Sequence, residues 1–162
     1  MSLGAIPHQE VKNSVGNVVH GTGICAIDGT NAENIQFTGT PQVSINGIQY
    51  TFSAEAELDI STEVDNVADL TAVADGYTVI FVVEVDASQN YTVAQGDAVA
   101  NADITAGTKS AHWPVATGNG VAALGAVKVK NATGSDFTFG TTDLDTAGIT
   151  DTYYNLSHYP SN

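Results

Sequence analysis

The segment from residue 48 to residue 60 constrains the fold more than any other part of the sequence. Every even position in it is apolar, from Ile48 to Ile60, and every odd position is polar or acidic. Side chains of an extended chain point to alternate faces, whereas a helix needs an apolar spacing of about 3.6 residues. The segment therefore predicts a strand with one dry face. Because strands usually run about five or six residues, we expect it to bend midway.

Turn residues and apolar runs next to this segment predict two hairpins. Asn46-Gly47 tolerates the positive φ angles of a two-residue turn, so residues 42–45 should pair back on residues 48–50. The run at residues 77–85 (YTVIFVVEV) is apolar on both faces for most of its length and rich in β-branched side chains. We interpret it as a central strand covered on both sides, with a hairpin partner at residues 91–95.

Weaker patterns account for the remaining elements. Residues 121–130 indicate a half-exposed strand, because valines alternate with lysines near its end, and residues 18–27 indicate an extended stretch interrupted by two glycines. Residues 64–74 permit one short helix, and residues 142–147 permit a helical turn between a capping threonine and a terminating glycine. Short strands therefore dominate the expected fold.

These elements predict an all-β chain with a β-sandwich or jelly-roll-like architecture. A length of 162 residues fits one compact unit plus extensions. Residues 1–35 show little period-two patterning before Val18 and contain Pro7 with scattered Gly and Asn. We interpret them as an extended N-terminal arm that ends in a first strand. Residues 36–162 then form the β-sandwich domain.

The charge balance excludes several classes of partner. Asp and Glu total 18 against four lysines and no arginine, which gives a net charge of -14. Nucleic-acid binding draws its affinity from clustered Lys and Arg, so we expect no nucleic-acid partner. The same negative charge would repel anionic lipid, so we expect no membrane partner either. The sequence also shows no signal-peptide pattern and no apolar run of about 18 residues. The acidic residues either keep the surface soluble or face solvent from a particle.

Residues suited to catalysis or metal binding do not gather in the sequence. No cysteine cluster, nucleophile elbow or phosphate-binding glycine loop is present, and the histidines lack metal-ligand spacing. Cys25 is the only cysteine, and we expect it to be a buried free thiol. We therefore predict a non-enzymatic chain without catalytic, cofactor-binding or metal-binding residues. The scattered histidines are His8, His20, His112 and His158.

Aromatic residues in the second half of the chain indicate a binding surface. Trp113 stands between His112 and Pro114, and Tyr153 is followed directly by Tyr154. Trp and Tyr are enriched at the centres of interfaces, yet a single Trp in a small β-protein is as often part of the core. Both interpretations stay open. If these residues form a contact, we expect it with another subunit rather than with a sugar.

Residues 120–160 (GVAALGAVKVKNATGSDFTFGTTDLDTAGITDTYYNLSHYP) contain a Phe-x-Phe-Gly-Thr-Thr-Asp-Leu-Asp stretch followed by Ala-Gly-Ile-Thr. Together with Asp75-Gly76-Tyr77 and residues 91–96, they resemble small structural proteins of tailed bacteriophages. The similar segments cover roughly the C-terminal half of the chain. The resemblance implies a capsid decoration, or cement, protein on the outer surface of the virion head.

That role implies a mechanical function and defined partners. Copies would bind the major capsid protein, bridge its neighbouring subunits and raise the cost of separating them. Cyclic symmetry predicts that the chain also binds itself, as a homo-dimer or homo-trimer. The arm would lie on the shell or clasp a sister subunit. The expected contact residues are Leu3, Ile6, Pro7, Lys12, Trp113, Tyr153 and Tyr154.

Two other classes of function compete with this interpretation. A head- or tail-fibre module that binds a host-surface glycan would need a groove lined by exposed aromatic side chains, for which Trp113, Tyr153 and Tyr154 are the candidates. A hydrolase or lyase would need a cluster of polar catalytic residues, which the sequence does not show. The glycan-binding module is the alternative that we retain.

Overall fold

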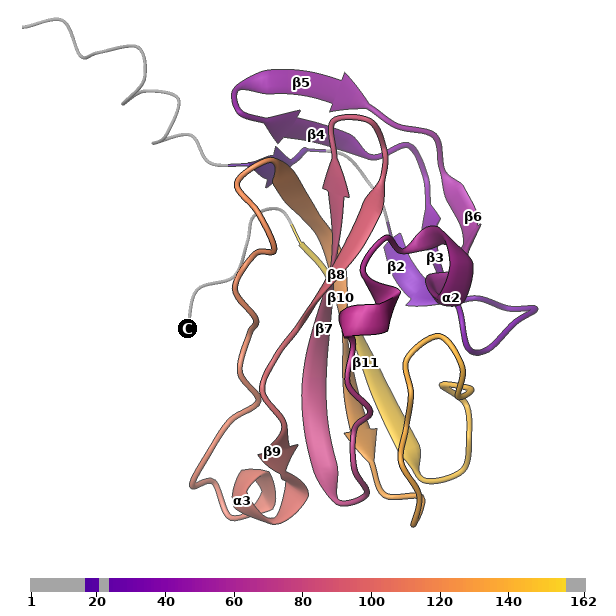
Figure 1. The fold of residues 1–162 in the computed structure, drawn as a ribbon, viewed down its shortest axis with the longest axis vertical. Helices are drawn as coiled ribbons and strands as arrows, with labels where there is room; N and C mark the ends of the chain where they lie inside the picture. Colours follow the sequence, from indigo (N-terminus) through magenta and orange to yellow (C-terminus); the bar gives the residue numbers. More distant parts are fainter. Residues whose placement is uncertain (1–16, 21–23, 157–162) are drawn as a thin grey trace, which may run out of the picture.

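A long antiparallel sheet forms the centre of the computed structural model, which describes residues 17–20 and 24–156 (Figure 1). Four strands pair in the order β11–β10–β7–β8, and a short strand, β9, pairs with the start of β7. With two smaller antiparallel sheets, this arrangement confirms the predicted all-β fold. The strands of the large sheet are β7 (Tyr77–Asp86), β8 (Tyr91–Gln95), β9 (Val99–Ala100), β10 (Val121–Asn131) and β11 (Ile149–Asn155).

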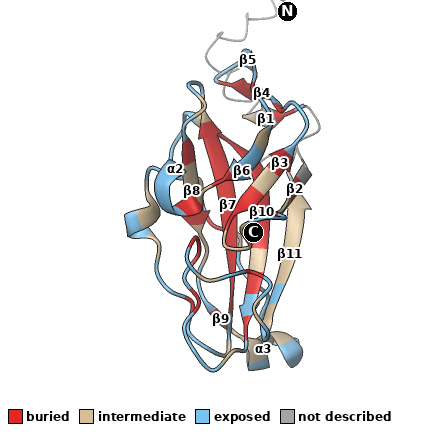
Figure 2. Ribbon diagram, turned by 90° about the vertical axis from the view of Figure 1, so that its right-hand side faces the viewer, coloured by how far each residue is buried: buried red, intermediate tan, exposed pale blue. Residues whose placement is uncertain are grey.

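The two smaller sheets have three strands each, in the orders β2–β3–β6 and β1–β4–β5. The β1–β4–β5 sheet lies at one end of the molecule, and helix α3 (Asn101–Thr105) lies with β9 at the other end, as both Figure 1 and Figure 2 show. The strands of the smaller sheets are β1 (Val18–Val19), β2 (Ile24–Ile27), β3 (Ile35–Thr38), β4 (Gln42–Ile45), β5 (Ile48–Thr51) and β6 (Glu55–Leu58).

Apolar clusters lie on both faces of the large sheet. Odd-numbered residues of β7, such as Phe81 and Val83, belong to the main core, which the β2–β3–β6 sheet shares. Even-numbered Ile80 and Val82 belong to a smaller cluster on the other face. Figure 2 shows the buried interior of β7 between the two. β7 is therefore the central strand, covered on both sides, that its composition predicted.

Gly125 allows the β2–β3–β6 sheet to approach the middle of β10. A register shift between Ala123 and Gly125 interrupts the ladder with β7. A Cβ atom at Gly125 would lie 2.7 Å from the Cβ atom of Cys25, which is too close for any side chain, so glycine is required here. Cys25 is a buried free thiol, as predicted, and burial raises its pKa to about 12.

Both predicted hairpins are confirmed. β4 pairs with β5 across Asn46 and Gly47, whose φ angles of 52° and 78° are positive, as a two-residue turn requires. β7 pairs with β8, with Val85 opposite Tyr91 next to the turn. The sequence signals for these hairpins are local, since each turn joins strands that are adjacent in the chain.

The alternating segment at residues 48–60 bends midway, as predicted, but it does not bury one face throughout. Its first part is β5, its second part is β6 in the other small sheet, and its last residue begins helix α2 (Ile60–Glu63). At the bend, the amide of Phe52 donates to the carbonyl oxygen of Pro41 at 2.9 Å. Ile48 and both alanines of the segment are exposed, because its two halves serve different sheets. The prediction of a single dry face is therefore wrong.

β10 is a second central strand, whereas the sequence predicted a half-exposed one. It pairs with β7 on one side and with β11 on the other. All of its residues are buried except Val121, Lys128 and Lys130. The alternation of valine with lysine is confined to residues 127–130, and β11, which the sequence analysis did not predict, covers the outer edge of the strand.

The two helical predictions do not hold over their full ranges. Within residues 64–74, the structure forms only the 3-10 helix η1 (Val67–Asp69). Residues 142–147 form turns and bends instead of a helix. Leu144 is buried in the main core, and its amide donates to the carbonyl oxygen of Ala32 at 2.9 Å, so the segment bonds to a distant loop where a helix would bond to itself. Its one internal backbone bond joins Thr146 to Asp143, a turn rather than a helix.

The predicted arm lies largely outside the described residues. This applies to residues 1–16 and hence to Leu3, Ile6, Pro7 and Lys12. The chain enters the described fold through β1, which pairs with β4. The arm is thus attached at the β1–β4–β5 end of the molecule. The division of the chain at residue 35 stays a prediction.

Candidate ligand pocket on the lysine-bearing face of the large sheet

The floor of the pocket consists of three neighbouring strands of the large sheet. Side chains directly opposite each other on antiparallel strands share a face. β10 therefore presents its two lysines between threonine and isoleucine side chains of its neighbours. From β7 through β10 to β11, the rows are Ile80, Lys128 and Thr152, then Thr78, Lys130 and Thr150.

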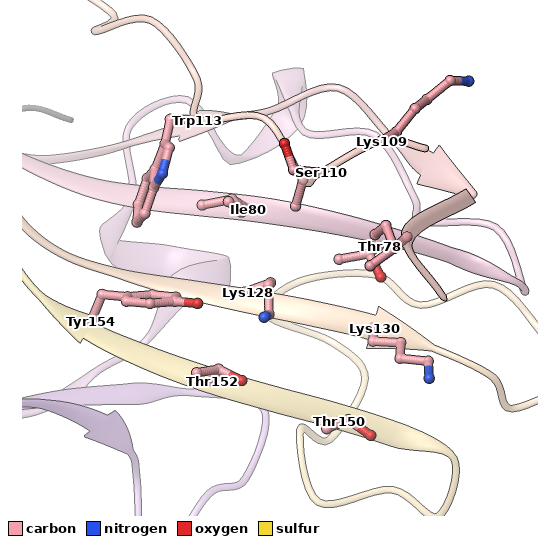
Figure 3. Close-up of a pocket in the computed structure, with 12 residues that line it drawn as sticks. Thr78, Ile80, Lys109, Ser110, Trp113, Lys128, Lys130, Thr150, Thr152 and Tyr154 are labelled. Carbon is pink, nitrogen blue, oxygen red and sulfur yellow. The ribbon is translucent and has the colours of Figure 1, made fainter. Parts of the chain in front are cut away.

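Helix α3 and the chain after it run along this face and form the wall of the pocket. Floor and wall border a half-open pocket of about 390 Å³, within the range of roughly 300–1,000 Å³ that is typical of ligand pockets. Figure 3 shows Trp113 and Tyr154 at one end of the cavity and Lys130 at the other, with Lys128 between them. The wall contributes Ile104, Lys109, Ser110, Ala111 and Trp113.

An aromatic pair closes one end of the pocket. The ring centroids of Trp113 and Tyr154 lie 5.2 Å apart at an interplanar angle of 71°, an edge-to-face arrangement that aromatic pairs favour. Both residues are half-buried and pack on the smaller apolar cluster, which includes Ile80 and Val82. The two rings therefore present a fixed apolar surface beside the polar floor.

Two features hold the wall against the sheet. A Cβ atom at Gly96 would lie 2.5 Å from the carbonyl oxygen of His112, so the lack of a side chain permits the close approach. Beyond His112, Thr117 donates to the carboxylate of Glu84 through its amide, at 3.1 and 3.2 Å, and through its hydroxyl. Thr92 also donates to this carboxylate, at 3.2 Å. Glu84 is 0% exposed, and these bonds compensate its burial.

Three of the four lysines of the chain line this pocket. Nζ of Lys109 lies 2.8 Å from the carboxylate of Asp103, which raises the pKa of Lys109. Lys128 is half-buried and Lys130 is exposed, and neither forms an ion pair within the described part of the chain. In a chain of net charge -14, these two ammonium groups create a locally positive surface.

Acidic side chains gather on the opposite side of the large sheet. Residues 55–69 and 136–145 pack on the main core through apolar residues such as Leu58 and Phe137. Burial and the Glu63 carboxylate raise the pKa of Glu55 in this region. The two sides of the sheet thus differ in charge. The acidic residues of these segments are Glu55, Glu57, Asp59, Glu63, Asp65, Asp69, Asp136, Asp143 and Asp145.

The structure brings two of the predicted contact residues together and separates a third. Trp113 and Tyr154 line the pocket, whereas Tyr153 packs against the main core, because neighbours on a strand alternate faces. The Tyr153 hydroxyl is buried and has no hydrogen-bond partner among the described residues. Burial, reinforced by the nearby Asp151 carboxylate, raises the pKa of Tyr153.

Sequence reasoning missed the lysines as site residues and missed the carboxylate that holds the wall. Lys128 and Lys130 alternate with buried valines, and in a chain so poor in cations this spacing is the signal that indicates a shared face. For Glu84 the only signal is one acidic residue inside an apolar run. Its partner Thr117 lies 33 residues away in the chain, so local patterns do not reveal the bond.

Comparison with known protein families, curated proteins and solved structures found no match for this chain. Across residues 17–20 and 24–156, no helix is long and apolar enough to cross a membrane. Over the same ranges, no group of three His, Cys, Asp or Glu side chains is placed to hold a metal ion. We therefore infer function from the charge distribution, the pocket and the exposed β1–β4–β5 end of the molecule.

Proposed function

We propose that this chain is a non-enzymatic decoration subunit of a tailed-phage virion, bound to the outer surface of the major capsid protein shell. The resemblance of residues 120–160 to phage structural proteins supports this role. An acidic side that faces solvent would keep the particle from non-specific association. By bridging neighbouring capsid subunits, each copy would raise the cost of separating them, and many such links would add up over a shell.

One end of the molecule combines three features suited to docking, and this combination carries the proposal. β5 forms an edge of the β1–β4–β5 sheet that no other described strand pairs with. Ile48, beside the hairpin turn, is 55% exposed. The arm joins the fold here, and the amide of Asn46 donates to the side chain of Asn17 at 2.9 Å, which ties the end of the arm to the turn. A free edge with an exposed apolar side chain favours association with another chain.

Matched aspartate substitutions test this docking end. Ile48→Asp should weaken binding to particles stripped of the chain at least about tenfold, because a charge would have to be desolvated in the contact. Val115→Asp is the control, since Val115 is 85% exposed but lies on the coil after α3. Co-sedimentation with purified particles measures binding. Equal binding by both variants, or particles that are equally heat-resistant without the chain, would contradict the proposal.

A head- or tail-fibre module that binds a host-surface glycan is the second candidate. The observation that favours it is the placement of Trp113 and Tyr154 in one pocket with the hydroxyl groups of Ser110, Thr150 and Thr152. Ligand pockets typically combine an apolar lining with a few placed polar groups. A sugar ring has the matching surfaces, because its C–H bonds suit an aromatic ring and its hydroxyls suit threonine and serine.

Trp113→Ala separates the two candidates when it is paired with Ile48→Asp. If the chain is a decoration subunit that docks through the β1–β4–β5 end, only Ile48→Asp should reduce particle binding. If it is a fibre module, Trp113→Ala should abolish binding to host cells and leave the particle intact. Retained cell binding by Trp113→Ala would remove the second candidate.

A further inference from the structure

We infer that the pocket on the lysine-bearing face binds a sugar that carries a carboxylate, so that its ligand is an acidic rather than a neutral glycan unit. This inference rests on the glycan-binding candidate and narrows its ligand class. The cavity of about 390 Å³ lies at the small end of the range for ligand pockets, which suits a short saccharide. The polar floor and the aromatic pair occupy different parts of it.

Lys128 and Lys130 provide the charge recognition. They lie two residues apart on one face of β10, so their backbone positions are about 7 Å apart. Within the described residues, no carboxylate neutralises either ammonium group. An anion is repelled by most of this chain, and a carboxylate bound here would gain charge-assisted hydrogen bonds. Lys109 contributes less, because Asp103 already holds its ammonium group.

Hydroxyl groups flank the two lysines. Thr150 and Thr152 stand opposite Lys130 and Lys128 on β11, and Ser110 lines the pocket from the wall. Each hydroxyl can donate one hydrogen bond and accept others, as sugar hydroxyls also do. When the lysines hold the carboxylate of an acidic sugar, the hydroxyls of the sugar ring would therefore lie beside the threonine and serine hydroxyls, with which they can exchange hydrogen bonds.

The aromatic pair supplies the apolar contact at the far end of the cavity. Trp113 and Tyr154 meet edge to face, and Ile80 lies on the floor beside them. An acidic sugar has this division within one molecule, since it carries a charged group at one position and C–H bonds over the face of its ring. The lysines and threonines lie side by side along the floor and the aromatic pair lies at one end, so the pocket separates its polar from its apolar contacts in the same way.

The floor of the pocket argues against other anionic ligands. The backbone N–H groups of β10, the strand that carries the lysines, take part in ladders with both neighbouring strands. An extended acidic peptide therefore finds no backbone partners beside the lysines, and would have to pair at the edge strand β11 instead. Phosphate sites commonly use clusters of free backbone N–H groups or the forked guanidinium of arginine. The paired floor does not offer the first, and the chain contains no arginine.

A matched pair of sugars tests the inference on the full chain. Methyl β-glucuronide and methyl β-glucoside differ only in a carboxylate in place of a hydroxymethyl group, and the galacto pair covers the other stereochemistry. Titration followed by NMR should show binding of at least one uronide, at least tenfold tighter than its neutral counterpart, with shifts at the Trp113 indole. Lys128→Gln combined with Lys130→Gln should weaken uronide binding about tenfold or more. Lys109→Gln should change it less than threefold.

The controls separate this inference from the glycan-binding candidate and from misfolding. Thr141→Val, an exposed site outside the pocket, should leave binding unchanged, and unchanged amide spectra would show that the lysine variants are folded. Equal binding of acidic and neutral sugars would overturn carboxylate recognition but keep a glycan-binding pocket. No binding of any sugar at tens of millimolar would overturn the inference. Binding of hexaglutamate without any sugar would overturn it in favour of a peptide-docking surface.

Discussion

Replacing Thr117 with valine tests whether the buried Glu84 carboxylate fastens the wall of the pocket to the sheet. The substitution keeps the amide that donates to Glu84 and removes the hydroxyl that also donates to it. Hydrogen bonds to charged groups contribute about 1.5–3 kcal/mol, and because Thr117 itself is exposed we take the lower half of this range. Thr117→Val should therefore lower the free energy of unfolding by about 1.5–2 kcal/mol.

Urea unfolding monitored by the fluorescence of Trp113, the only tryptophan of the chain, measures this loss. With a urea dependence of about 2 kcal/mol per molar, typical of small proteins, the midpoint should fall by about 0.8–1 M. Thr141→Val, whose side chain is exposed, should stay within about 0.5 kcal/mol of the wild type.

A double-mutant cycle isolates the contribution of the bond. In a Glu84→Gln background the acceptor is neutral, so Thr117→Val should cost about 1 kcal/mol less than in the wild type. An identical loss in both backgrounds would refute the reasoning, because the hydroxyl would then not interact with the charge of Glu84. Loss of pocket binding in Thr117→Val at full stability would point instead to a direct role in ligand contact.

Two further predictions concern buried groups of the main core. Burial raises the pKa of Cys25 from 9.0 to about 12, so the unfolded chain releases this proton first and stability should fall as pH rises above 9, by about 1.4 kcal/mol at pH 10. Urea unfolding at pH 8 and 10 measures the loss, which should be smaller by about this amount in Cys25→Ala, while the buried Tyr153 keeps its own smaller contribution. Tyr153→Phe removes a buried oxygen without a partner in the described structure and should raise the thermal midpoint by about 2–4 °C; a lowered midpoint would count against this.

The parts of the fold that the sequence predicted are those whose signals are local. Asn46-Gly47 specifies its own turn geometry, and the apolar, β-branched composition of residues 77–85 is enough to predict that this strand is buried. The sheet that a strand joins depends on pairing with strands elsewhere in the chain, which a local pattern does not specify. Residues 48–60 show one continuous pattern, yet they divide between two sheets, because β5 pairs with β4 and β6 pairs with β3. Likewise β10 is buried by β11, which lies beyond an intervening loop and carries a mixed polar sequence.

The candidate site was predictable only in part for the same reason. Trp113 and Tyr154 stood out by residue type, but their contact joins positions 41 residues apart, and only the register of β11 decides that Tyr154 rather than Tyr153 faces Trp113. The shared face of Lys128 and Lys130 follows from their spacing. Their opposition to Thr152 and Thr150 depends on tertiary pairing and could not be read from the sequence.

The pocket has a floor of paired strands and a wall of irregular backbone, and these two parts differ in how freely they can evolve. A substitution at Ile80 in the floor would disturb the packing of the large sheet, whereas exposed coil tolerates changes of residue type and of length. Exchanging exposed residues between Gly107 and Val115 should therefore alter recognition while the lysine rows stay in place. The same stretch is the natural graft point for an engineer who wishes to retarget this scaffold.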